Sequence, residues 1–213
     1  MKRKYVPALI LSTLIALIPL FVGLFLWDKL PAEVATSFGF NGEITGYSSK
    51  TFAVIGLPLI IIIANLICYF AILTDPRRNN IGKVAINAVL CIVPICSLFT
   101  GVLIYKDYIG LQINAGTCGA AFAGIVFFVI GLVLPKCKQN YTVGIRLPWT
   151  LNSEENWNKT HIFASKLWVF GGIIMAVLGF LGLEIVTFAL IAVIITVPVI
   201  YSYIYYRKEN HNN

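Results

Sequence analysis

Residues 52–73 read FAVIGLPLIIIIANLICYFAIL, and this apolar run without a charged side chain decides the fold class. A helix rises 1.5 Å per residue, so about 20 apolar residues cross the roughly 30 Å hydrocarbon core of a bilayer. A transmembrane β-strand would be about half as long, and its side chains would alternate in polarity. The run therefore predicts a membrane-spanning α-helix.

The rest of the chain repeats this pattern five times. Apolar runs cover about residues 6–27, 84–105, 116–134, 167–182 and 185–206, and the fifth is short enough that we expect preceding residues to extend it. Hydrophobic residues make up 59% of the 213 and charged residues only 12%, against about 25% charged in soluble domains. The sequence predicts an all-α multi-pass protein, one membrane domain over residues 1–213, with three spans in 1–115 and three in 116–213.

The distribution of Lys and Arg predicts the orientation. With the N-terminus inside, 13 of the 16 Lys and Arg residues fall on the cytoplasmic side, beginning with Lys2, Arg3 and Lys4. Both termini are then cytoplasmic, loop 28–50 is external and loop 135–166 is cytoplasmic. The net charge of +7 is thus a topology signal, and we expect no direct nucleic-acid partner. The first apolar run is too long for a signal peptide, so we expect a retained anchor.

Two loops exceed the usual length of a connection between helices. Loop 28–50 contains Asn41-Gly42 and Gly46, which predict tight turns in a compact cap or re-entrant segment. In loop 135–166, Asn152 followed by Glu155 predicts a helix start. The residues Trp157, His161, Ala164 and Trp168 then recur on one helical face. We expect this helix to lie on the membrane surface before turning into the fifth span.

Polar residues inside the spans are few. Asn65 and Asn87 are expected to hydrogen-bond between helices, and the seam Gly116, Ala120 and Gly124 suits a close neighbouring helix or a second copy of the chain. The intramembrane acids and bases typical of ion-coupled transport are missing. Because a long loop follows the first span of each half, a 3+3 inverted repeat is a further hypothesis, and with it a small transporter or exporter of a peptide or lipid.

Catalytic and metal-binding patterns are also missing. The sequence has no Gly-x-Ser-x-Gly, His-Glu-x-x-His or phosphate-binding loop, so we expect no enzyme activity and no cofactor. His161 lacks a second ligand, and we expect no metal site. The five cysteines show no Cys-x-x-Cys pattern and predict no disulfide framework.

The two long loops carry a family resemblance that extends over essentially the whole chain. In loop 135–166 the dense motif consists of Asn140, Gly144, Arg146, Pro148, Trp149, Trp157 and His161. It resembles the signature of the SdpI family, which are bacterial membrane immunity and signal-transduction proteins. In loop 28–50, Phe38, Gly42, Gly46 and Lys50 resemble the extracellular motif of a companion domain found in the same family.

This resemblance implies two roles. The first is immunity against a secreted antimicrobial peptide toxin that contacts the external loop. The second is signalling, in which the cytoplasmic motif recruits an ArsR-like repressor to the membrane. From the residues alone, Arg146 could bind a partner's carboxylate or a lipid phosphate, and the tryptophans could form a docking surface or an interfacial belt. The transporter and a purely structural membrane partner remain as alternatives.

Overall fold

The computed structural model describes residues 5–211, so the predicted cytoplasmic cations Lys2, Arg3 and Lys4 lie outside the described residues. Within the described range, six helices are long and apolar enough to cross a membrane. They are Val6–Phe25, Phe52–Thr74, Lys83–Ile109, Ala115–Lys136, Glu154–Phe180 and Glu184–Glu209. The predicted number of spans is confirmed, and every predicted edge lies within a few residues of these bounds except the start of the fifth.

The fifth span corrects one prediction. Helix α7 (Glu154–Phe180) is continuous, so the separate helix expected on the membrane surface does not exist. Its N-cap is Ser153, one residue after the predicted Asn152, and the Ser153 side chain accepts a hydrogen bond from the Asn156 backbone N–H. No Gly or Pro interrupts residues 154–167, so nothing ends the helix there. The predicted face of Trp157, His161 and Ala164 is buried within the protein.

The chain forms two compact units. The first contains Met1–Phe70 and Val89–Cys118, and the second contains Ala71–Ala88 and Gly119–Asn213. Helices α3 (Leu57–Thr74), α4 (Lys83–Tyr105) and α5 (Ala115–Val133) contribute residues to both units. The division into halves at 115/116 and their inverted-repeat relation stay predictions.

In the first unit, the first span is kinked. Helix α1 (Val6–Ala16) and helix α2 (Ile18–Phe25) meet at Leu17, two residues before Pro19, which has no N–H to continue the ladder. The Ser97 hydroxyl donates to the Ala16 carbonyl at 2.8 Å and so satisfies part of the break. The amide of Asn65 donates to the Ser12 hydroxyl at 2.7 Å, which confirms the interhelical bond predicted for Asn65.

Loop 28–50 is a β-hairpin, a compact cap with a tight turn, and not the re-entrant segment that was the alternative expectation; the strands themselves were not predicted. Strand β1 (Glu33–Phe38) pairs antiparallel with β2 (Ile44–Ser49), with Ala35 opposite Tyr47. Gly42 occupies the connecting turn at φ +85°, the left-handed region that glycine adopts without strain. Val34 is fully buried in a cluster with Leu26, Leu30, Val54, Ile104 and Tyr105, so the hairpin shares the core of the first unit. It is followed by a π-helical turn, Phe52–Gly56, that leads into α3.

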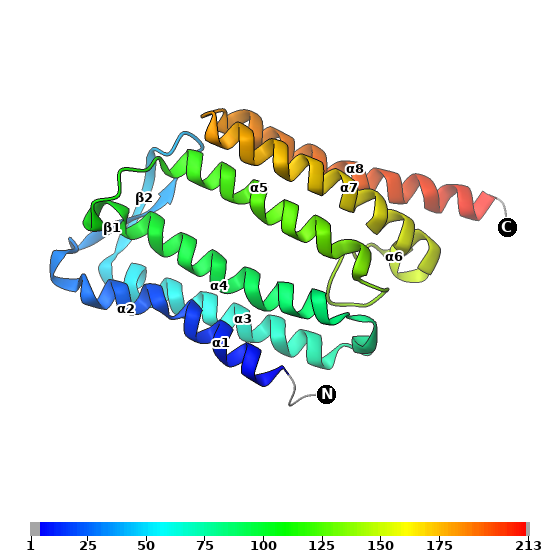
Figure 1. The fold of residues 1–213 in the computed structure, drawn as a ribbon, viewed down its shortest axis with the longest axis horizontal. Helices are drawn as coiled ribbons and strands as arrows, with labels where there is room; N and C mark the ends of the chain where they lie inside the picture. Colours follow the sequence, from blue (N-terminus) through cyan, green and yellow to red (C-terminus); the bar gives the residue numbers. More distant parts are fainter. Residues whose placement is uncertain (1–4, 212–213) are drawn as a thin grey trace. The chain divides into compact units, whose positions relative to one another are not determined.

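In the second unit, helices α7 and α8 (Glu184–His211) lie side by side, with the short helix α6 (Pro148–Asn152) at their end (Figure 1). Helix α5 also packs on α7, because a side chain at Gly124 would meet the backbone of Gly172 and Ala176. This part of the predicted small-residue seam is therefore used inside the chain. Asn87, by contrast, is exposed and forms no hydrogen bond within the described residues, so that prediction is wrong.

Candidate functional site

Residues 137–153, called the docked loop below, contain five of the seven predicted motif residues. Asn140 is fully buried in it, and its amide makes four hydrogen bonds. Nδ2 donates to the carbonyls of Lys138 and Val143, at 2.8 and 3.0 Å. Oδ1 accepts from the N–H groups of Thr142 and Val143, at 2.8 and 2.7 Å. These bonds use the amide's full capacity, so Asn140 fixes a turn of the loop and has no donor left for a ligand.

The middle of the docked loop is fixed by Gly144 and His161. Gly144 has φ +125°, and a side chain there would collide with the rings of Trp157 and His161. The next residue, Ile145, donates its backbone N–H to Nε2 of His161 at 3.0 Å. Because an N–H group can only donate, Nε2 must be unprotonated, and Nδ1 carries the proton that it donates to the Trp157 carbonyl at 2.8 Å. His161 is therefore a neutral structural acceptor for the loop.

Trp157 fixes the start of the docked loop. Its indole is fully buried, stacks on His161 at 4.1 Å between ring centroids, and donates through Nε1 to the Cys137 carbonyl at 2.8 Å. Burial raises the pKa of the Cys137 thiol to about 11. A tryptophan enclosed in this way offers no surface to a partner or to lipid, so Trp157 serves the fold of the loop.

The connection between α3 and α4 also holds the docked loop, through residues that the sequence analysis missed. The buried carboxylate of Asp75 accepts from the Tyr141 N–H at 2.9 Å, the Thr142 hydroxyl at 2.6 Å and the Arg77 N–H at 2.6 Å. Gln139 accepts from the Arg77 guanidinium and donates to the carbonyls of Thr150 and Leu151. An acidic residue directly after an apolar span was the available signal, but its partners in the docked loop, Tyr141 and Thr142, lie more than 60 positions away.

Helix α6, the last part of the docked loop, packs against α8. Pro148 is its first residue and is exposed, and Thr150 accepts from the Leu147 N–H at 2.9 Å. Trp149 donates to the Ser202 hydroxyl at 2.9 Å and packs edge-on against Tyr203, with 5.3 Å between ring centroids. Trp149 is thus half-buried between the loop and α8.

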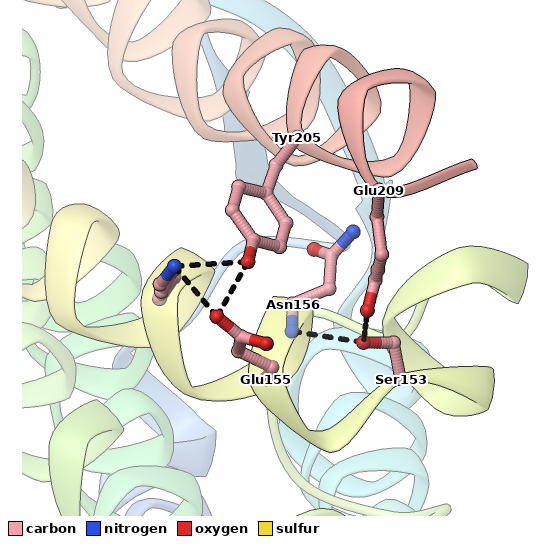
Figure 2. Close-up of polar contacts among 6 residues, drawn as sticks. Ser153, Glu155, Asn156, Tyr205 and Glu209 are labelled. Atoms are coloured by element: carbon pink, nitrogen blue, oxygen red, sulfur yellow. Dashed lines mark hydrogen bonds and ion pairs between the residues drawn. The ribbon is translucent and has the colours of Figure 1, made fainter. Parts of the chain in front are cut away.

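Polar contacts tie the start of α7 to the end of α8 (Figure 2). Ser153 donates to Glu209 at 3.0 Å. Asn156, which is fully buried, donates to the Ser202 carbonyl at 3.0 Å. On the exposed side, Tyr205 donates to Glu155 at 2.6 Å, and Lys159 forms an ion pair with the same carboxylate at 2.7 Å. These contacts hold the two helices together where the docked loop sits.

Arg146 is the charged member of the predicted motif, and it is exposed. Its guanidinium donates to the Tyr141 carbonyl at 2.6 Å and has no further partner within the described part of the chain. The neighbouring motif residues shape the backbone that carries it. The docked loop therefore presents one arginine from a fixed position.

The hairpin motif residues are mostly structural as well. Lys50 donates to the Trp27 carbonyl at 3.1 Å and lies over the Trp27 ring at 5.1 Å. Gly46 pairs with Ser37, and half-buried Phe38 pairs with Ile44. Three apolar side chains of the hairpin are exposed and were missed by the sequence analysis: Phe40, Ile44 and Tyr47.

Asn114, also missed, joins the hairpin turn to helix α5. Its Nδ2 donates to the Asn41 carbonyl at 3.0 Å, and its Oδ1 accepts from the N–H of Gly116 at 2.8 Å and of Thr117 at 3.0 Å. This N-cap geometry satisfies the first turn of α5 and anchors the turn of the hairpin at once. Among the described residues, no group of three or more His, Cys, Asp and Glu side chains is arranged to hold a metal ion.

Comparison with known proteins connects both loops to one kind of protein. Residues 136–202, which include the docked loop, match the SdpI/YfhL protein family, and residues 14–62, which include the hairpin, match a domain of unknown function, DUF1648. The chain is 28% identical over 205 residues to the immunity protein SdpI of Bacillus subtilis (strain 168), an alignment that covers 94% of this chain and 97% of that protein. No solved structure matches the chain.

Proposed function

Because residues 136–202 match the SdpI/YfhL protein family, we propose that this multi-pass bacterial membrane protein protects its cell against a secreted antimicrobial peptide toxin. The observation that carries the proposal is the similarity to a bacterial immunity protein over 94% of the chain. The match includes both long loops and all six candidate spans, so it is not confined to generic membrane helices.

The hairpin is the proposed contact with the toxin. In the orientation favoured by the Lys and Arg distribution, loop 28–50 is external and both termini are cytoplasmic. The hairpin exposes Phe40, Ile44 and Tyr47 beside the exposed acids Glu33 and Glu43. Apolar side chains next to negative charge suit a cationic amphipathic peptide. Phe38, Gly42, Gly46 and Lys50 contribute by shaping the hairpin that presents these groups.

The docked loop is the proposed signalling surface. It would recruit an ArsR-like repressor to the cytoplasmic face, with Arg146 as the side chain positioned to reach a partner. Because Asn140, Trp157 and His161 hold the backbone of the loop, their replacement would disturb signalling indirectly, through the fold of the loop.

Survival of a toxin-sensitive bacterium tests the immunity proposal. Cells expressing the chain are challenged with a graded dose of a cognate or related secreted peptide toxin. We expect the wild type to raise the inhibitory dose and Tyr47→Ala to lower it at equal membrane abundance. Thr45→Ala, an exposed change on the same strand, is the matched control and should protect like the wild type. If the wild type protects against none of these peptides at confirmed abundance, the immunity proposal is wrong.

A transcriptional reporter controlled by the repressor tests the signalling proposal separately. We expect toxin to induce the reporter in wild-type cells and Arg146→Ala to reduce that induction. Membrane fractionation of the repressor should show the same loss of recruitment. A repressor that stays in the soluble fraction with the wild-type protein would contradict the proposal.

A further inference from the structure

We propose that Arg77, Lys138 and Arg146, called the basic rim below, bind the phosphate group of an anionic phospholipid. The site is distinct from the proposed toxin contact and does not depend on the immunity function. All three residues belong to the second unit. Arg77 and Arg146 both contact Tyr141, and Lys138 precedes Tyr141 by three residues in the docked loop.

The guanidinium groups of Arg77 and Arg146 both contact Tyr141. Arg146 donates to the Tyr141 carbonyl at 2.6 Å, and the guanidinium of Arg77 lies over the Tyr141 ring at 4.9 Å. Tyr141 is itself fixed, because its N–H donates to Asp75 at 2.9 Å. Arg146 is exposed, and its guanidinium makes no other hydrogen bond within the described residues. A planar guanidinium with free N–H groups is well suited to phosphate oxygens.

The charge around the rim is uncompensated. Lys138 is exposed, and its side chain has no partner within residues 5–209, whose side chains are described. The nearest acid in the contact network is Asp75, which is buried and already accepts three hydrogen bonds. The rim therefore offers positive charge to a ligand, whereas Lys159 on α7 is paired with Glu155 at 2.7 Å.

The depth of the rim places its cations at the level of lipid headgroups. Candidate spans end at Thr74 and Lys136, so Arg77 and Lys138 follow them by three and two residues. The headgroup layer on each side of the hydrocarbon core is roughly 5–8 Å thick, about the reach of two or three residues. Arg146 lies at the same level, since its hydrogen-bond partner Tyr141 contacts Asp75, the residue after Thr74. An exposed arginine at this depth, as Arg146 is, meets lipid phosphates first.

A binding titration with the purified full-length chain in detergent tests the proposal. The thermal unfolding midpoint is followed as short-chain phosphatidylglycerol is added, with short-chain phosphatidylcholine as the zwitterionic reference and inorganic phosphate as the free anion. Binding to the folded state raises the midpoint in proportion to affinity. We expect phosphatidylglycerol to raise the midpoint at concentrations where neither reference does.

Variants then localise the site. Arg146→Gln and Lys138→Gln should each weaken phosphatidylglycerol about fivefold, and the double variant about 25-fold. Arg146→Lys, which keeps the charge but loses the planar fork, should weaken it less than Arg146→Gln. Lys159→Gln removes the same charge from an exposed, ion-paired position and is the matched control, expected within about twofold of wild type. Because all three side chains are exposed, these variants keep the fold.

Several results would overturn the proposal. One is an equal effect of phosphatidylglycerol and phosphatidylcholine on the wild type, and another is an equal loss in the rim variants and Lys159→Gln. If inorganic phosphate raised the unfolding midpoint as much as phosphatidylglycerol does, the site would bind a free anion and not specifically a lipid. If Arg146→Gln left lipid affinity unchanged and abolished binding of an acidic protein partner, the rim would be a protein contact instead.

Discussion

Asn140 and His161 form hydrogen bonds with the backbone of the docked loop, and these bonds determine how replacing either residue should affect stability. Each holds N–H groups of the docked loop that would otherwise be buried without a partner. A buried donor left unsatisfied costs about 1–3 kcal/mol, more than the net gain from an average hydrogen bond. Changes at these two residues should therefore appear first as lost stability.

Gly144→Ala tests this at the tightest point of the docked loop. We expect a loss of about 3 kcal/mol, because alanine is strained at φ +125° and its Cβ would collide with Trp157 and His161. Thermal unfolding of the purified protein measures it. Gly119→Ala in α5 is the control, since nothing lies within 4 Å of its added Cβ. Equal midpoints for the two variants would contradict the described loop.

Cys137 should report whether the loop is docked. Its thiol is buried and has a pKa of about 11, so at pH 8 only about one thiol in a thousand is ionised. In a variant that keeps Cys137 alone, we expect maleimide to react slowly with the folded protein and fully after denaturation. Trp157→Phe, which removes the donor to the Cys137 carbonyl, should speed the reaction. Rapid labelling of the folded parent would show that the thiol is accessible.

Among the elements, α7 does most to organise the second unit. Near the start of α7, Trp157 and His161 form hydrogen bonds with the docked loop. The preceding residue, Asn156, forms a hydrogen bond with α8. A residue buried between two helices contributes more than an exposed ion pair on the same turn, because solvent screens the pair.

A pair of identical substitutions on α7 separates its two faces. Asn156→Leu should lower the unfolding free energy by about 2 kcal/mol, since it removes the bond to the Ser202 carbonyl and the acceptor of the Thr160 hydroxyl. Asn158→Leu changes an exposed residue two positions away and should leave the midpoint nearly unchanged. Size-exclusion profiles confirm that both variants are folded. A larger effect at Asn158 would reverse the assignment of the faces.

The sequence was sufficient for the spans and insufficient for the loops, for physical reasons. A span is determined by local hydrophobicity, which a run such as residues 52–73 displays directly. The hairpin was missed because β2 is rich in Gly, Ser and Thr and has little apolar alternation, and its strands are fixed by Val34 entering a distant core. The motif residues were found by resemblance. Asp75, Gln139 and Asn114, which hold the two loops in place, were missed because their bonds join distant segments of the chain.

For the whole molecule, the testable property is orientation. In a cysteine-free background, we expect a membrane-impermeant maleimide to label Thr45→Cys on intact cells. Lys138→Cys should react only after the cells are permeabilised, because the docked loop is proposed to be cytoplasmic. Both positions are exposed, so access to the reagent depends on the side of the membrane alone. The reverse pattern would place the hairpin in the cytoplasm and remove its proposed contact with a secreted toxin.

The length of α7 has a consequence for how the protein sits in membranes of different thickness. Its 27 residues make a rod of about 40 Å, roughly 10 Å longer than the hydrocarbon core. A helix whose apolar stretch exceeds the hydrocarbon core usually tilts or stretches the surrounding lipids. Here the surplus is the polar first two turns, and the docked loop packs on one face of them through Trp157. Because polar turns resist entry into the hydrocarbon core, we expect α7 to keep its depth and the surrounding lipids to adjust when the bilayer thickness changes.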